Sequence, residues 1–221
     1  MEYKKALIIS PFCYPNVGGC ESFVEDLAKA LSEKYLVHVC TIDWKKPILW
    51  QGLPIFKGLK MLLKLNSAYR NMPKDVKYEK VYALGIISSI VCVLNKINFD
   101  AIILALYDFK GRHPLFTRIL NKATRVFVEG ERGKKDMLKL GIQENKIIKF
   151  QHWCDQTRFQ NTIRNHKKLK VLFIGRPIKI KGKHIIEKCE TLTKDIDYEY
   201  IENMQYSELP DIYKKADVCC I

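Results

Sequence analysis

The residues best suited to chemistry stand in one short basic segment, Gly175 to Gly182, which runs Gly-Arg-Pro-Ile-Lys-Ile-Lys-Gly. It directly follows the apolar run Leu169 to Ile174, which predicts a buried strand. Arg offers a planar donor fork and Lys a mobile point charge, a pairing suited to a diphosphate. Between Arg164 and Lys188, nine Lys or Arg residues stand against one acid, a net charge of +8. A basic, solvated loop is the alternative interpretation.

A second candidate site is Val17-Gly18-Gly19-Cys20-Glu21, between a predicted strand and a predicted helix. Glycines here allow the backbone to approach an anion, and the helix N-terminus supplies free N–H groups and a positive dipole end. Open α/β sheets bind ligands at the carboxyl ends of their strands. Gly18 and Gly19 are therefore candidate anion-binding residues, with a plain turn as the alternative.

Hydrophobic periodicity alternates between strand and helix along the chain and predicts the elements that carry these sites. Strands are expected at 6–9, 36–42, 99–106, 125–128, 146–150, 169–174, 198–201 and 218–221, and helices at 21–33, 115–122, 133–140, 183–192 and 207–215. Such alternation indicates parallel sheets covered by helices. The polar stretch 155–168 predicts a linker between two units. The second has about three strands, and the chain stops inside the apolar strand 218–221, so we expect this unit to be incomplete.

Composition excludes a disordered chain, because 48% of the 221 residues are hydrophobic. The eight cysteines include no Cys-x-x-Cys pair, and Cys40 and Cys92 lie in apolar runs, so we expect buried free thiols and a reducing cytosol. No signal peptide is visible. The longest uncharged run, Val81 to Asn95, is too short to span a bilayer and predicts a buried helix. A cytoplasmic location is therefore expected.

The segment near 57–70 predicts a cationic amphipathic helix, with Leu59, Leu62, Leu63 and Tyr69 at helical spacing and basic residues between them. Such a helix can lie on an anionic membrane surface, which makes peripheral membrane contact one expectation. The alternative is a solvated helix that packs one face on the sheet.

Four motifs in the same order resemble those of the family 4 glycosyltransferases of the GT-B fold. They are Pro11–Thr41 with its Gly-Gly-x-Glu, Gly130–Phe159, Phe173–Gly182 with its Gly-Arg…Lys-Gly, and Leu209–Val218. The resemblance covers most of the chain. It implies two Rossmann-like parallel-sheet domains: residues 1–160 on the acceptor side, and residues 161–221 as a partial donor domain.

The resembling family transfers a sugar, of hexosyl type, from a nucleoside-diphosphate sugar to a glycan or lipid-linked acceptor, with retention and without a metal or other cofactor. By position, Arg176 and Lys181 would hold the donor diphosphate, and Gly18 and Gly19 would bring backbone N–H groups to it from the other domain. The resemblance further implies a role in building a polysaccharide or glycolipid of the cell envelope.

The chain departs from the family pattern in three places. The family's Glu-x7-Glu segment would lie beyond Ile221, and the first domain is short between Leu106 and Ala123. For the sugar-contacting His only His113 is a candidate, against the alternative of a surface-loop histidine. Asp195-Ile196-Asp197 has a metal-binding form but falls at the amino end of a predicted strand, so no metal site is expected.

Two other function classes follow from the same residues. The chain could be a catalytically inactive GT-B remnant or binding subunit that needs a partner chain, and we expect weak turnover from the isolated 221 residues. The net charge of +14 also suggests a nucleic-acid-binding protein. Because the charge peaks on a diphosphate-type loop, we expect no nucleic-acid partner.

Overall fold

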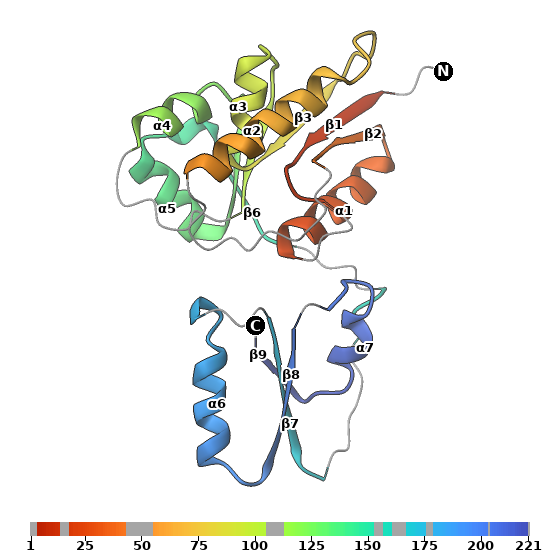
Figure 1. Ribbon diagram of the computed structural model, residues 1–221, viewed down its shortest axis with the longest axis vertical. Coiled ribbons are helices and arrows are strands. Elements are labelled where there is room, and N and C mark those ends of the chain that lie inside the picture. The colour runs from red at the N-terminus through yellow and green to blue at the C-terminus, as the bar shows by residue number, and fades with distance from the viewer. Residues whose placement is uncertain are drawn as a thin grey trace. The chain divides into compact units, whose positions relative to one another are not determined.

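The chain forms two compact α/β units (Figure 1). The computed structural model describes residues 4–13, 18–42, 55–104, 113–152, 157–160, 167–175, 179–202 and 204–220. The units span Met1–His152 and Trp153–Ile221. Most of the expected linker lies outside the described residues. The functional boundary expected between residues 160 and 161 stays a prediction.

The first unit is built on a six-stranded parallel sheet of order β2-β1-β3-β4-β5-β6. Its elements are β1 Lys5–Ile9, α1 Gly19–Ser32, β2 Leu36–Cys40, α2 Ile55–Arg70, β3 Lys80–Leu84, α3 Gly85–Leu94, β4 Asp100–Ile103, α4 Pro114–Leu120, β5 Val126–Glu129, α5 Gly130–Leu140, η1 Glu144–Lys146 and β6 Ile147–Phe150. Ile8 of β1 lies between Val39 of β2 and Tyr82 of β3, so β1 is a central strand. The chain turns one way from β1 to β2 and the opposite way from β3 onward, which places a topological switch point between β1 and β3.

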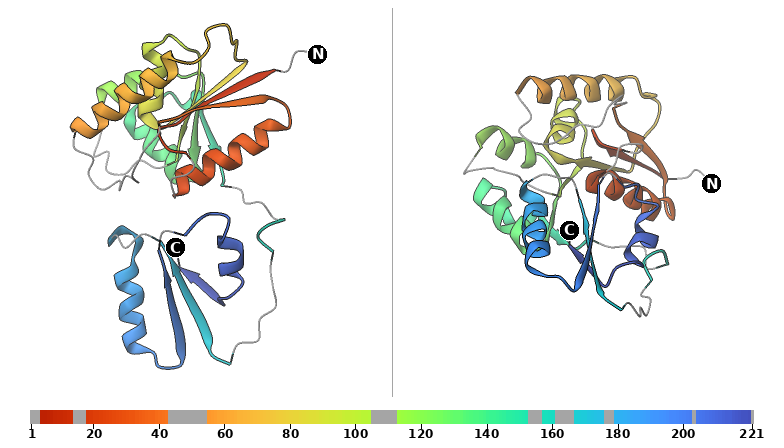
Figure 2. Two further views of the ribbon diagram at one scale, coloured as in Figure 1. Left: turned by 45° about the vertical axis from the view of Figure 1, so that its right-hand side comes forward. Right: turned by 60° about the horizontal axis from the view of Figure 1, so that its bottom comes forward.

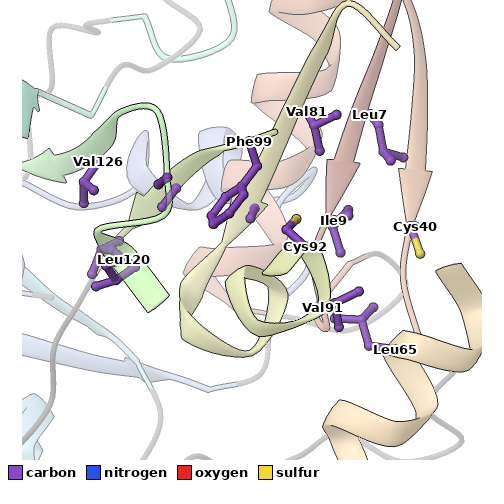
Figure 3. Close-up of a cluster of buried hydrophobic side chains, with 14 of the residues drawn as sticks. Leu7, Ile9, Cys40, Leu65, Val81, Val91, Cys92, Phe99, Leu120 and Val126 are labelled. Atoms are coloured by element: carbon purple, nitrogen blue, oxygen red, sulfur yellow. The ribbon is translucent and has the colours of Figure 1, made fainter. Parts of the chain in front are cut away.

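The handedness of the crossovers decides which face of the sheet each helix covers. A right-handed connection puts α1 on one face and α2, α3, α4 and α5 on the other, as Figures 1 and 2 show. Phe23 and Val24 of α1 pack with Ile8 in one buried cluster. The opposite face carries the larger cluster, to which α2 contributes Met61 and Leu65 (Figure 3). This burial supplies the main favourable term for folding the first unit.

The prediction of one buried helix over Val81 to Asn95 is wrong in its first part. Residues Lys80–Leu84 form β3, and α3 begins at Gly85 without a connecting loop. Gly85 adopts the left-handed φ of +73° that ends the strand, a conformation that side chains rarely tolerate. Because strand and helix are both apolar and directly joined, hydrophobicity alone hid the boundary. No helix in the described part of the chain is long and apolar enough to cross a bilayer.

The second unit has a three-stranded parallel sheet of order β8-β7-β9, as expected for an incomplete doubly wound unit. Its elements are β7 Leu169–Ile174, η2 Lys179–Lys181, α6 Lys183–Leu192, β8 Ile196–Ile201, α7 Leu209–Tyr213 and β9 Val218–Cys220. The central strand β7 buries Leu172 and Phe173. Its two neighbours are reached in opposite directions, so a second switch point lies between β7 and β9. Asp195 and Asp197 stand at the amino end of β8, as predicted.

The seven described cysteines are free thiols. Cys40 and Cys92 are buried as expected, and burial raises their thiol pKa to about 11 and about 12, so both stay protonated at neutral pH. Cys189 and Cys219 are exposed, which contradicts the expectation of burial. Cys189 lies on the outer side of α6, and Cys219 lies in the edge strand β9, where the neighbouring Val218 is also exposed.

One ion pair with a buried carboxylate links two neighbouring strands of the first unit. The Nε of Arg125, just before β5, donates to Oδ1 of Asp100 in β4 at 3.1 Å, and its Nη2 donates to Oδ2. The Asp100 side chain is 8% exposed, against 39% for Arg125. The bidentate geometry compensates the cost of burying this carboxylate.

We predict that Arg125→Leu lowers the free energy of unfolding by about 2–4 kcal/mol, because the buried Asp100 carboxylate loses its partner. Urea denaturation followed by circular dichroism measures the loss. Lys4→Met is the matched control, because it breaks an exposed pair with Glu79 and is expected to cost less than about 1 kcal/mol. Equal losses of unfolding free energy in the two variants would show that the pair of Arg125 and Asp100 stabilises the fold no more than an exposed pair does.

Candidate functional site

The basic segment Gly175–Gly182 emerges from the carboxyl end of β7, at the switch point of the second unit. The backbone N–H of Gly175 donates to the carbonyl of Ile201 at 3.1 Å, which ties the end of β7 to the end of β8. A Cβ on Gly175 would lie 3.3 Å from Cζ of the buried Phe173, so the strand exit leaves little room for a side chain. The position is the one at which open parallel sheets bind ligands.

Gly182 turns the chain from this segment into α6. Its φ of +77° is left-handed, which favours glycine, and its carbonyl accepts the N–H of Ile185 at 2.8 Å. Among the residues that the structure describes, no side chain caps this helix end. The N–H groups of the first two residues, Lys183 and His184, have no intrahelical acceptor by the geometry of an α-helix, and the positive end of the helix dipole lies beside the segment. Backbone donors and cationic side chains thus gather at one strand end.

The lysines around α6 differ in whether a carboxylate pairs with them. Lys183 Nζ pairs with Glu202 Oε1 at 2.8 Å and lies 3.8 Å from Glu187 Oε1. The hydrogen bond to Glu202 raises the pKa of the Lys183 ammonium. Lys179 and Lys181 are exposed, and neither makes an ion pair with any other residue that the structure describes.

Lys181 is the predicted site residue that the structure places best. A Cβ on Gly175 would meet the Cγ of Lys181 at 3.8 Å, so the stem of Lys181 lies against the end of β7. Its ammonium charge remains available at the same edge as the N-terminus of α6. Arg176, its predicted partner, lies outside the described residues, so its role stays a prediction.

Sequence reasoning missed the pair of Lys183 and Glu202. Glu202 directly follows β8, whose carboxyl end lies beside that of β7 because Ile174 and Ile201 are register partners. Parallel pairing of the two predicted strands could have brought Glu202 to this edge, but the basic run drew attention to its cations alone. The carboxylate removes one of those cations from ligand binding.

In the first unit, Gly18 and Gly19 stand at the start of α1. The carbonyl of Gly18 accepts both the N–H and the hydroxyl of Ser22, at 3.1 and 3.0 Å. A Cβ on Gly18 would lie 2.5 Å from Oε2 of Glu21, so the protein's own carboxylate covers this residue. A Cβ on Gly19 would meet nothing within 4 Å. Because the Glu21 carboxylate is the end of a flexible side chain that can move aside, neither glycine is required sterically. Diphosphate binding by the two glycines stays a prediction.

His113 precedes α4, and its ring stacks on that of Phe116, with centroids 4.0 Å apart. The side chain is exposed. This contact with the helix that it precedes provides a structural role, and its proposed contact with a sugar stays a prediction.

A second histidine, His152, lies in a richer setting than the sequence suggested. Its Nε2 lies 3.2 Å from Oε2 of Glu129, and its ring packs edge-on against Phe23 and Phe150. Glu129 and Phe150 end neighbouring strands, so parallel pairing assembles this group at the carboxyl edge of the first sheet. The cluster fixes the exit of β6.

No protein-family model and no curated protein sequence matches the chain. Solved structures do match it. Sucrose-phosphate synthase from Thermosynechococcus elongatus is similar with a TM-score of 0.72 at 14% identity, over 99% of this chain and 75% of that one. Anabaena HepE in complex with UDP-glucose is similar with a TM-score of 0.63 at 12% identity, over 96% of this chain and 65% of that one. A UDP-N-acetylglucosamine 2-epimerase is similar with a TM-score of 0.60 at 12% identity, over 99% of this chain and 74% of that one.

At these identities the likeness shows the fold alone. It confirms the expected fold class, two Rossmann-like parallel-sheet units of the GT-B type. Both glycosyltransferases and an epimerase share this architecture, so the chemistry must be argued from the residues of the site.

We predict that Gly182→Ala destabilises the protein by about 1–2 kcal/mol, because alanine is strained at a φ of +77°. Gly19→Ala is the control: it opens a helix at ordinary φ with free space around its Cβ, and we expect a change below about 0.5 kcal/mol. Thermal unfolding of both variants checks this. If Gly182→Ala left the stability unaltered, the backbone before α6 would accommodate alanine without strain, and the prediction would be wrong.

Proposed function

We propose that the segment Gly175–Gly182 binds the diphosphate of a nucleoside-diphosphate sugar, and that the protein is a GT-B glycosyltransferase. The observation that carries the proposal is the convergence of Lys181 and the uncapped N-terminus of α6 on the carboxyl end of the central strand β7. Each element favours an anion, and a diphosphate offers two negative groups to meet both.

In the proposed reaction, the bond between the anomeric carbon and the diphosphate oxygen breaks, and the anomeric carbon forms a bond to an acceptor oxygen. The acceptor hydroxyl loses its proton, and the nucleoside diphosphate leaves with the bonding electron pair. Negative charge grows on that leaving group in the transition state. Cations and helix N–H groups fixed in place before the reaction stabilise it.

The finer parts of the proposal follow the resemblance of the sequence motifs. They are retention of configuration, hexosyl transfer, independence of a metal ion, and a glycan or lipid-linked acceptor. Arg176 would share the diphosphate with Lys181, and its planar fork suits two phosphate oxygens. UDP is the first nucleotide to test, because HepE is seen in complex with UDP-glucose.

We predict that UDP or GDP binds and that uridine does not. Lys181→Ala and Arg176→Ala should each weaken binding by roughly 1.5–3 kcal/mol, the range for hydrogen bonds to charged groups. Lys179→Ala is the matched control, because Lys179 is also exposed and lies two residues away. It should cost less than about 0.5 kcal/mol. Arg176→Lys should restore little of the loss, because the fork is absent.

Calorimetric titration at two salt concentrations separates a built site from a solvated basic loop. A loop acts through net charge, so all three alanine variants would lose equally and moderate salt would erase binding. That outcome would contradict the proposal. Turnover assays with a panel of nucleotide sugars then distinguish transfer to an acceptor from epimerisation of the donor. Binding without any turnover would favour the alternative of a binding subunit.

A further inference from the structure

The outer face of α2 exposes leucines although the helix is firmly packed. Leu59 and Leu63 are 51% and 60% exposed and stand one helical turn apart. On the opposite side, Met61 and Leu65 are fully buried in the larger core cluster. The helix therefore already has a complete inner face. Its two outward leucines have no role in the packing of the core.

The neighbouring helices of the same layer repeat the pattern. Figures 1 and 2 show α2, α3 and α4 together over one face of the sheet. Leu94 at the end of α3 is 56% exposed, and Leu115 in the first turn of α4 is 54% exposed. Single exposed leucines are ordinary, and Leu94 and Leu115 stand at opposite ends of their helices. The pair Leu59 and Leu63, one turn apart on α2, is therefore the apolar feature of this layer that calls for an explanation.

The three helices that carry these leucines have charge of one sign. The helices α2, α3 and α4 contain no Asp or Glu, whereas α2 contains Lys57, Lys60, Lys64 and Arg70. Lys60 and Lys64 are exposed and directly follow the two exposed leucines in the sequence. On the other face of the sheet, α1 carries Glu21, Glu25 and Asp26. On the face that carries the leucines, α5 adds two acids, Glu131 and Asp136, against four Lys or Arg residues, so the helices of that face are basic overall whereas α1 is acidic overall.

We propose that the outer face of α2 docks on an anionic lipid bilayer. Leu59 and Leu63 enter the boundary between headgroups and acyl chains, and Lys60 and Lys64 contact lipid phosphates. A nucleic acid would meet the lysines, but leucines offer it neither stacking rings nor hydrogen bonds. The lipid surface satisfies both features. The proposal does not depend on the glycosyltransferase assignment, and its test uses no activity.

Co-sedimentation of the full chain with vesicles tests the proposal. Vesicles of phosphatidylcholine with about 30% phosphatidylglycerol should bind the protein at about 0.15 M salt, and vesicles of phosphatidylcholine alone should not. The variant L59S/L63S should bind at least about tenfold more weakly, since two apolar side chains no longer enter the bilayer. L36S/L192S is its control, because both leucines are exposed but lie outside this helix layer.

The charge is tested in parallel with two double variants of equal charge change. K60E/K64E should abolish vesicle binding, while K188E/K194E, which alters exposed lysines of the second unit, should leave it nearly unaltered. The proposal would be overturned if K60E/K64E and K188E/K194E weakened vesicle binding equally, or if L59S/L63S bound vesicles as the unaltered protein does. It would also be overturned if the protein bound neutral and anionic vesicles equally well. Duplex DNA binding that requires Lys60 and Lys64, without vesicle binding, would overturn it in favour of a nucleic-acid surface.

Discussion

The right-handed crossover between parallel strands is the constraint on which the rest of this molecule depends. It leaves α1 alone on one face of the first sheet and places α2 to α5 on the other. In both units the strands that follow the central strand lie first on one side of it and then on the other. A switch point therefore forms beside β1 and beside β7. The proposed ligand site and the proposed lipid surface are consequences of that arrangement.

The chemistry at the β7 edge is a balance of charges rather than a count of basic residues. Nine Lys or Arg residues crowd the sequence around the segment, but Glu202 already neutralises Lys183 across the ends of β7 and β8. Lys181 keeps its charge and lies against Gly175. In the first unit the carboxylate of Glu21 lies beside Gly18. The two glycine-containing helix starts therefore differ in the side chains that lie beside them.

The sequence predicted most strands and helices because each is a short apolar run with its own period and a clear punctuating residue, such as Gly141 after α5. It failed at Val81–Asn95, where Gly85 joins strand to helix inside one apolar run. Lys181 was predicted as a site residue from its motif, and its role stays a prediction. The sequence did not reveal the pairs made by Glu202, Asp100 and His152. Their partners lie far away in the sequence, and only strand pairing brings them together. The outward position of Leu59 and Leu63 likewise needed the register of α2 on the sheet.

The central claim is that a diphosphate occupies the end of β7 and the N-terminus of α6. Hydrogen–deuterium exchange with and without saturating UDP tests it most directly, because the N–H groups of the first two residues of α6, Lys183 and His184, lack intrahelical acceptors. The account predicts slower exchange in a peptide covering residues 174–186 and unaltered exchange in one covering β8 and the region after it. Protection confined to other segments, or no protection at saturation, would contradict the account.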